Sequence, residues 1–165
     1  MPEWSAYVAP GLFVALLLAA ALSDGFRRRI PNWVVLGLIG LYVVIAVLGI
    51  APTGPWPALG AALIAFPITY GLYHFGILGA GDTKLFTAVA LFAGLNWLMP
   101  LALFTALFGG LFAIGFLIAR PRRVMRGLTS AGRAEGASSG IPYGIPIALG
   151  AACVCLLNGF LNFTA

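Results

Sequence analysis

Long apolar segments, separated by short stretches rich in proline, glycine and charge, constrain this chain most strongly. They predict helices near residues 7–22, 33–50, 57–75, 85–98, 100–119 and 145–163. A helix needs about 20 mostly apolar residues to cross the hydrocarbon core of a bilayer, and these runs lack the alternation of membrane β-strands. We therefore expect an all-α membrane protein, with residues 1–165 forming one polytopic bundle of about six transmembrane helices.

Charged residues make up only 8% of the chain, and the mean hydropathy is +1.06. Soluble domains carry about a quarter charged residues, so a water-soluble fold is excluded. The formal net charge of +5 comes from basic residues in the short stretches between apolar runs. Basic residues in such places orient a protein in the lipid bilayer, and we do not expect nucleic acid as a partner.

The basic residues also predict how the helices are oriented. All nine lie in the predicted loops 24–32, 76–84 and 120–140, whereas the loops 51–56 and 96–100 contain none. By the positive-inside rule the three basic loops are cytoplasmic, which places both termini outside and requires an even number of spans. The loop 120–140, rich in Arg, Gly and Ser, is expected to lie near anionic lipid.

Two of the four acidic residues stand at predicted helix ends on the cytoplasmic side. Asp24 ends the first helix and Asp82 precedes the fourth. An ionisable residue at membrane depth indicates a functional site by default. Each carboxyl also has a structural explanation: Asp24 could pair with Arg27 or Arg28, and Asp82 could cap its helix beside Lys84.

A pair of close carboxyls has a chemistry that neither has alone. When they share one proton, the ionised member can activate a water and the protonated member can polarise a peptide carbonyl. That is the chemistry of an aspartic peptidase, and it needs no metal or cofactor. A serine triad or a zinc site would lack parts, since His74 is the only histidine and has no acid beside it.

Glycines surround the second aspartate, in the stretch Gly79-Ala80-Gly81-Asp82-Thr83-Lys84. Glycine allows sharp backbone turns and close approach of another chain. We expect Gly79 and Gly81 to shape the site so that a peptide can reach the carboxyl.

Two motifs resemble those of the prepilin peptidase family, whose members are membrane aspartic peptidases of the GxGD type. The first is Asp24 followed by Ile30-Pro31-Asn32, and the second is the stretch from Gly79 to Lys84. A third stretch, Ile141-Pro142-Tyr143-Gly144, is similar to the Pro-aromatic-Gly sequence that begins the family's last helix. A turn that simply starts a helix explains this third stretch equally well.

The resemblance implies that Asp24 and Asp82 are catalytic, that Gly79 and Gly81 shape the loop, and that Lys84 positions or tunes the site. Lys84 could instead only anchor its helix at the lipid headgroups. Only eight residues separate Asp24 from Trp33, and no Cys-x-x-Cys occurs, so the larger members' zinc-binding methyltransferase domain has no counterpart here. The implied protein is a minimal peptidase of the bacterial inner membrane that cuts the leaders of type IV prepilins and pseudopilins at the cytoplasmic face.

Other functions remain open from the sequence. Two membrane-level carboxyls would also suit a small proton- or ion-coupled transporter, although such sites usually lie near the membrane midplane. A non-catalytic assembly protein of a pilus or secretion machine would use the basic residues of 120–133 to bind a partner. A protease of the signal-peptide-peptidase kind would share the chemistry but cut deeper in the bilayer. The sequence determines neither the particular pilin nor the oligomeric state.

Overall fold

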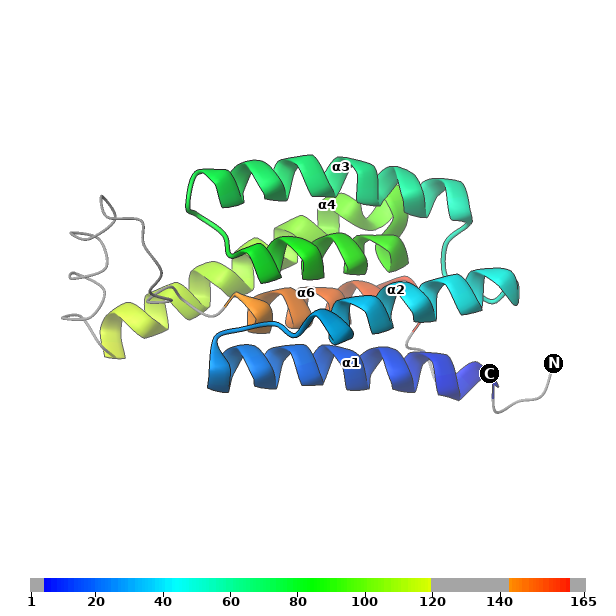
Figure 1. Ribbon diagram of the computed structural model, residues 1–165, viewed down its shortest axis with the longest axis horizontal. Coiled ribbons are helices and arrows are strands. Elements are labelled where there is room, and N and C mark those ends of the chain that lie inside the picture. The colour runs from blue at the N-terminus through cyan, green and yellow to red at the C-terminus, as the bar shows by residue number, and fades with distance from the viewer. Residues whose placement is uncertain (1–4, 120–142, 161–165) are drawn as a thin grey trace.

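The computed structural model describes residues 5–119 and 143–160, and these form an all-helical bundle (Figure 1). Within these ranges the chain has no strands, as predicted. The helices are α1 (Ser5–Arg27), α2 (Asn32–Val47), α3 (Pro55–His74), α4 (Ala80–Ala119) and α6 (Gly144–Leu157). The predicted loop 120–140 and the end of the last predicted helix, residues 161–163, lie outside the described residues.

Helix α4 is interrupted at Gly94, where φ is 66° and ψ is 179°. Figure 1 shows that its two halves run in opposite directions, so α4 is a helical hairpin. The sequence predicted this reversal at 96–100, but those residues are helical and Pro100 lies inside the second half. Glycine adopts a positive φ without the Cβ clash that other residues suffer, which explains why the chain turns at Gly94.

Side chains from two other parts of the chain bind the carbonyls next to this break. An interrupted helix leaves the carbonyls of its last turn without their usual donors. Thr53 Oγ1 donates to the Leu91 carbonyl at 3.0 Å, and Asn158 Nδ2 donates to the Phe92 carbonyl at 3.5 Å. The Tyr42 hydroxyl in turn donates to the Thr53 carbonyl at 3.0 Å, so the α2–α3 connection is fixed against the break.

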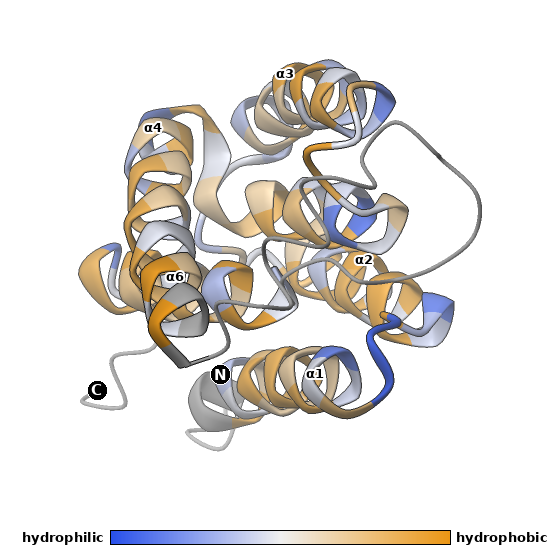
Figure 2. Ribbon diagram, turned by 90° about the vertical axis from the view of Figure 1, so that its left-hand side faces the viewer, coloured by the Kyte–Doolittle hydropathy of each residue, from blue (hydrophilic) through white to orange (hydrophobic). Residues whose placement is uncertain are grey.

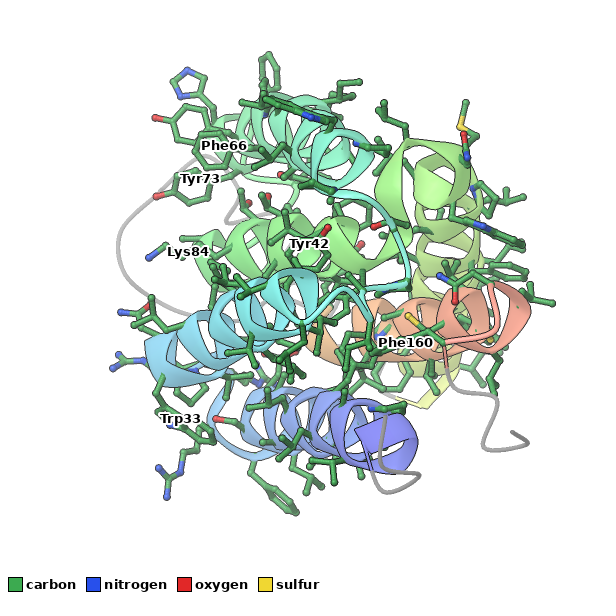
Figure 3. All side chains as sticks on the ribbon, turned by 90° about the vertical axis from the view of Figure 1, so that its right-hand side faces the viewer. Trp33, Tyr42, Phe66, Tyr73, Lys84 and Phe160 are labelled. Atoms are coloured by element: carbon green, nitrogen blue, oxygen red, sulfur yellow. The ribbon has the colours of Figure 1, made fainter. Side chains whose placement is uncertain are left out.

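An aromatic cluster packs the interior of the bundle. The ring centroid of Phe92 lies 4.5 Å from that of Phe13, 5.4 Å from that of Tyr42 and 5.7 Å from that of Phe160. These rings join α1, α2 and α4 to the segment that follows α6, and Figure 3 labels Tyr42 and Phe160 among them. The cluster therefore holds elements that are far apart in the sequence.

Among the residues that the structure describes, three helical stretches are long and apolar enough to cross a membrane: Val8–Arg27, Pro55–His74 and Ala80–Gly115, the last of which contains the reversal at Gly94. Helices α2 and α6 are apolar but shorter, with 16 and 14 residues. Hydrophobic residues extend along all the helices, and a strongly hydrophilic stretch connects α1 to α2 (Figure 2). The count of six spans and the location of both termini outside stay predictions.

Two predicted loops are shorter in the structure than in the sequence interpretation. Helix α1 continues to Arg27 and α4 begins at Ala80, so the loops 24–32 and 76–84 were predicted too long. Asp24 and Asp82 consequently lie within helices, one in the last turns of α1 and the other in the first turn of α4. Helical positions hold a side chain more rigidly than a loop does.

Candidate active site

Asp24 is buried, with only 6% of its surface exposed, near the end of α1. Its Oδ2 accepts a hydrogen bond of 2.7 Å from the backbone N–H of Gly144, the first residue of α6. The first N–H groups of a helix have no partner within the helix, and a carboxyl is a favourable acceptor for them. The beginning of α6 therefore orients the Asp24 carboxyl from a position 120 residues away in the sequence.

Asp82 is 8% exposed and is the third residue of α4. Its Oδ2 accepts a hydrogen bond of 3.2 Å from the N–H of Gly79, the residue before the helix. A side chain in the first turn that reaches back to this N–H is one half of a capping box. Asp82 thus caps α4 from within the helix, whereas the sequence interpretation placed it before the helix.

The next residue, Thr83, fixes the start of α4 against α3. Its hydroxyl lies 3.2 Å from the carbonyl of Thr69 and 3.2 Å from that of Gly79, and both threonines are buried. The contact with Thr69 therefore attaches the first turn of the helix that carries Asp82 to α3, whereas the contact with Gly79 is local to α4.

The two carboxyls meet at one end of the bundle. Figure 1 shows that the end of α1 and the beginnings of α4 and α6 lie at this same end. Asp24 is close enough to Asp82 to act on it electrostatically. Burying an ionisable carboxyl is unfavourable unless it is bonded, and burying two beside each other is more so. Buried ionisable groups of this kind cluster at functional sites, which makes this pair the candidate active site.

The glycines of the second motif lie against neighbouring side chains of the site, and the predicted access of a peptide to the carboxyl stays a prediction. A Cβ on Gly79 would lie 2.7 Å from Asp82 Oδ2, and a Cβ on Gly81 would lie 3.2 Å from Ile30 Cβ. Neither glycine has a positive φ; the positive φ of 72° in this connection belongs to Gly76. Gly79 thus leaves room for the Asp82 carboxyl, and Gly81 leaves room for the first motif to pack against the second.

Lys84 links the same two motifs on the outside of the bundle. Its Nζ donates to Asn32 Oδ1 at 3.4 Å, and Figure 3 shows its side chain pointing away from the bundle. Residues two apart on a helix point in nearly opposite directions, so Lys84 and Asp82 face different sides of α4. The contact places the Lys84 side chain against the start of α2, and its role in the site stays a prediction.

The connection between α1 and α2 places the basic residue Arg28 near Asp24. Arg28 acts electrostatically on Asp24, as the structural explanation of Asp24 anticipated. It also has a positive φ of 50°, and its N–H bonds the Asp24 carbonyl at 2.9 Å. Ser23 Oγ donates to the Arg29 carbonyl at 2.8 Å, which closes the turn.

Sequence reasoning missed several residues that support the site: Ser23, Thr69, Gly76 and Thr83. It named Gly144 only within a stretch resembling a family motif and gave it no role. Ser and Thr are common in turns and helices for many reasons, so their presence alone carried no signal. Among these residues, only Gly144 was indicated by the sequence, because it stands directly before the last predicted helix.

These observations describe a helical bundle with membrane-spanning character and a buried carboxyl pair at one end. A model of the type IV leader peptidase family matches residues 11–114, which include Asp24, Asp82 and both motifs. Because the match covers more than half of the chain, this protein belongs to the type IV leader peptidase family and is a peptidase. No curated protein and no solved structure matches the chain.

Proposed function

We propose that this protein is a membrane aspartic endopeptidase that removes the leader peptide of type IV prepilin-like or pseudopilin-like substrates, with Asp24 and Asp82 as its catalytic pair. The observation that carries the proposal is the meeting of these two buried carboxyls, from α1 and α4, at one end of the bundle. Membership of the type IV leader peptidase family supports the reaction and the substrate class.

The reaction follows from two carboxyls that share one proton. The ionised carboxyl removes a proton from a water, which attacks the scissile carbonyl carbon, while the protonated carboxyl donates a hydrogen bond to the carbonyl oxygen. The tetrahedral intermediate then collapses as a carboxyl delivers a proton to the leaving amine. One oxygen of each aspartate is bonded to a backbone N–H, so the other oxygen is assigned to water and substrate.

The substrate would bind from within the bilayer at the cytoplasmic face of a bacterial inner membrane. A prepilin places its cleavage site at the cytoplasmic end of an apolar helix, and the basic connection Arg27-Arg28-Arg29 beside Asp24 favours a cytoplasmic location for this end. The cleaved product would pass to a pilus or secretion machine. The proposed reaction uses no cofactor.

Substitution of either aspartate tests this function directly. We expect Asp24→Asn and Asp82→Asn each to abolish leader removal when a prepilin is co-expressed, because a carboxamide cannot exchange the proton. Processing is followed by gel shift and by the mass of the pilin. The matched control is Glu135→Gln, which neutralises a carboxyl outside the proposed pair and should leave processing unchanged.

The amount of each variant in the membrane fraction shows whether the protein still folds and inserts. Full processing by either aspartate variant, at normal membrane levels, would contradict the two-carboxyl mechanism. Function would then have to be sought in ion transport or in assembly of a pilus machine.

A further inference from the structure

The beginning of α6 contributes to the site although it lies outside the part of the chain that the family model matches, residues 11–114. Gly144 bonds Asp24 through its backbone N–H at 2.7 Å, the shortest hydrogen bond described at either aspartate. Since α1 ends close to this point, the Asp24 side chain is held between its own helix and the start of α6. The bond is buried and is therefore poorly screened.

Residue 144 has no room for a side chain. A Cβ there would lie 2.8 Å from Asp24 Cβ, 2.8 Å from Oδ2 and 3.0 Å from Cγ. The atoms it would strike belong to the base of the Asp24 side chain as well as to its carboxyl, so a rotation of Asp24 does not remove the clash. The close approach that makes the 2.7 Å bond possible thus requires glycine.

The residue before it anchors this glycine to α4. A Cβ on Gly109, in the second half of α4, would lie 3.3 Å from Cε1 of Tyr143 and 3.9 Å from Cβ of Pro146. The Tyr143 ring therefore packs over a part of α4 that lacks a side chain. This contact fixes where α6 begins relative to the second half of α4, and therefore where the Gly144 N–H lies.

We propose that Gly144 is a positioning residue that orients the catalytic carboxyl of Asp24, and that the Tyr143–Gly109 contact holds it in place. The inference rests on the proposed function and extends it to the last helix. The Gly144 N–H binds Oδ2 and thereby leaves Oδ1 for the reaction with water and substrate. The site is assembled from three helices, and the pair is not correctly oriented by α1 and α4 alone.

The first test compares Gly144→Ala with Gly110→Ala, because a Cβ at Gly110 meets nothing within 4 Å. Purified variants cleave a prepilin in detergent, and kcat and KM are determined separately. We expect Gly144→Ala to lower kcat about 100-fold with little change in KM, since a misplacement of about 1 Å can have an effect of this size. Gly110→Ala should match the wild type. Equal kcat values for the two variants, or a rise in KM alone, would overturn the proposal.

A second test measures the contact without using activity. Thermal unfolding is followed for Gly144→Ala in the wild-type background and in the Asp24→Gly background. If the methyl group strikes Asp24, Gly144→Ala lowers Tm in the wild type and has much less effect once the Asp24 side chain is removed. An equal loss in both backgrounds would disprove the contact, even if cleavage itself proved to have another mechanism.

The anchor is tested by two substitutions of Tyr143. Tyr143→Phe keeps the ring over Gly109 and should retain kcat, whereas Tyr143→Ala removes the ring and should lower kcat at least 10-fold, the loss expected of a displaced catalytic group. Retention of kcat by Tyr143→Ala would overturn the anchoring role. If Asp24→Asn and Asp82→Asn are inactive while Gly144→Ala is fully active, this inference fails and the proposed function stands.

Discussion

At the scale of single residues, each aspartate of the pair is bonded by the N–H of a glycine that stands at the start of a helix. Gly79 bonds Asp82 and Gly144 bonds Asp24, and at both glycines a Cβ would come within 3 Å of the bonded carboxyl. The two glycines are 65 positions apart, and each binds the carboxyl of one aspartate through its backbone N–H. A backbone donor is well suited to orient a carboxyl because it cannot rotate away.

We predict that Gly79→Ala lowers kcat/KM for prepilin cleavage at least 10-fold. The new methyl group would lie 2.7 Å from Asp82 Oδ2, so the carboxyl must move and its bond to the N–H must lengthen. Initial rates of leader release, measured with purified protein, give the ratio. Gly71→Ala is the matched control, because a Cβ there meets nothing within 4 Å. Wild-type rates for Gly79→Ala would show that Asp82 does not depend on this contact.

A separate prediction concerns the link between Lys84 and Asn32. The 3.4 Å bond is exposed and long, so we expect a coupling of no more than about 0.5 kcal/mol between Lys84→Met and Asn32→Ala in a double-mutant cycle of unfolding free energies. Each single variant should keep most of its peptidase activity. Loss of cleavage in Lys84→Met at unchanged stability would instead indicate a direct role for Lys84 in the reaction.

At the scale of the helices, the break at Gly94 decides how α4 contributes to the bundle. The first half carries Asp82, and the second half carries Gly109, which contacts Tyr143. A continuous helix of 40 residues would carry Gly109 beyond the opposite end of the bundle, far from Asp82. The reversal brings the second half back toward that end, so the geometry of the site depends on a turn at the other end of the bundle (Figure 1).

We therefore predict that Gly94→Ala is strongly destabilising. Residue 94 has a φ of 66°, and a Cβ would lie 2.7 Å from Thr53 Cγ2, so both the backbone and the packing oppose a side chain. A loss of about 2 kcal/mol or more is expected from these two effects together. The measurement is Tm in detergent, with Gly110→Ala as control. A Tm within error of the control would mean that the chain does not reverse here.

Thr53 gives a milder test of the same element. Thr53→Val removes the hydroxyl that bonds the Leu91 carbonyl and should reduce stability by about 1 kcal/mol, as expected when a partly buried acceptor loses its donor. Thr53→Ser keeps the hydroxyl and should be closer to the wild type. Equal unfolding free energies for the Val and Ser variants would show that the carbonyl has another donor.

At the scale of the whole molecule, the helical segments place the carboxyl pair and the basic α1–α2 connection at one end and the Gly94 reversal at the other (Figure 1). Apolar side chains remain exposed on the outer faces, among them Leu63 at 72% and Leu36 at 67%. In water such a surface would associate, whereas lipid tails cover it without penalty.

The proposed orientation predicts which connections a membrane-impermeant thiol reagent reaches in intact cells. In a variant with Cys153 and Cys155 replaced by Ala, Gly54→Cys should be labelled from outside. Arg29→Cys and Phe75→Cys should be labelled only after the membrane is opened, because the positive-inside rule places that end in the cytoplasm. Labelling of Arg29→Cys in intact cells would indicate the opposite orientation and contradict a cytoplasmic location of the site.

The class of fold and the two candidate catalytic residues were predictable from the amino-acid sequence. Apolar runs of about 20 residues admit few structures other than membrane helices. Asp24 and Asp82 were recognisable because ionisable residues are rare and unfavourable in such segments. The all-helical prediction is confirmed among the described residues, and family membership is confirmed by the match to residues 11–114. The catalytic roles of the two aspartates stay predictions.

The groups that hold the carboxyls and the position of the turn in α4 were visible only in the folded chain. The predicted position of the α4 reversal, residues 96–100, was wrong. Asn96 and Pro100 are residue types that favour turns, but the backbone turns at Gly94. The donor from Gly144 to Asp24 joins residues 120 positions apart, and no local pattern specifies such a pairing. A glycine can allow a turn, make room for a carboxyl or make room for a packed neighbour. Which of these it does depends on the atoms that face it, and the packing of helices distant in the sequence places those atoms.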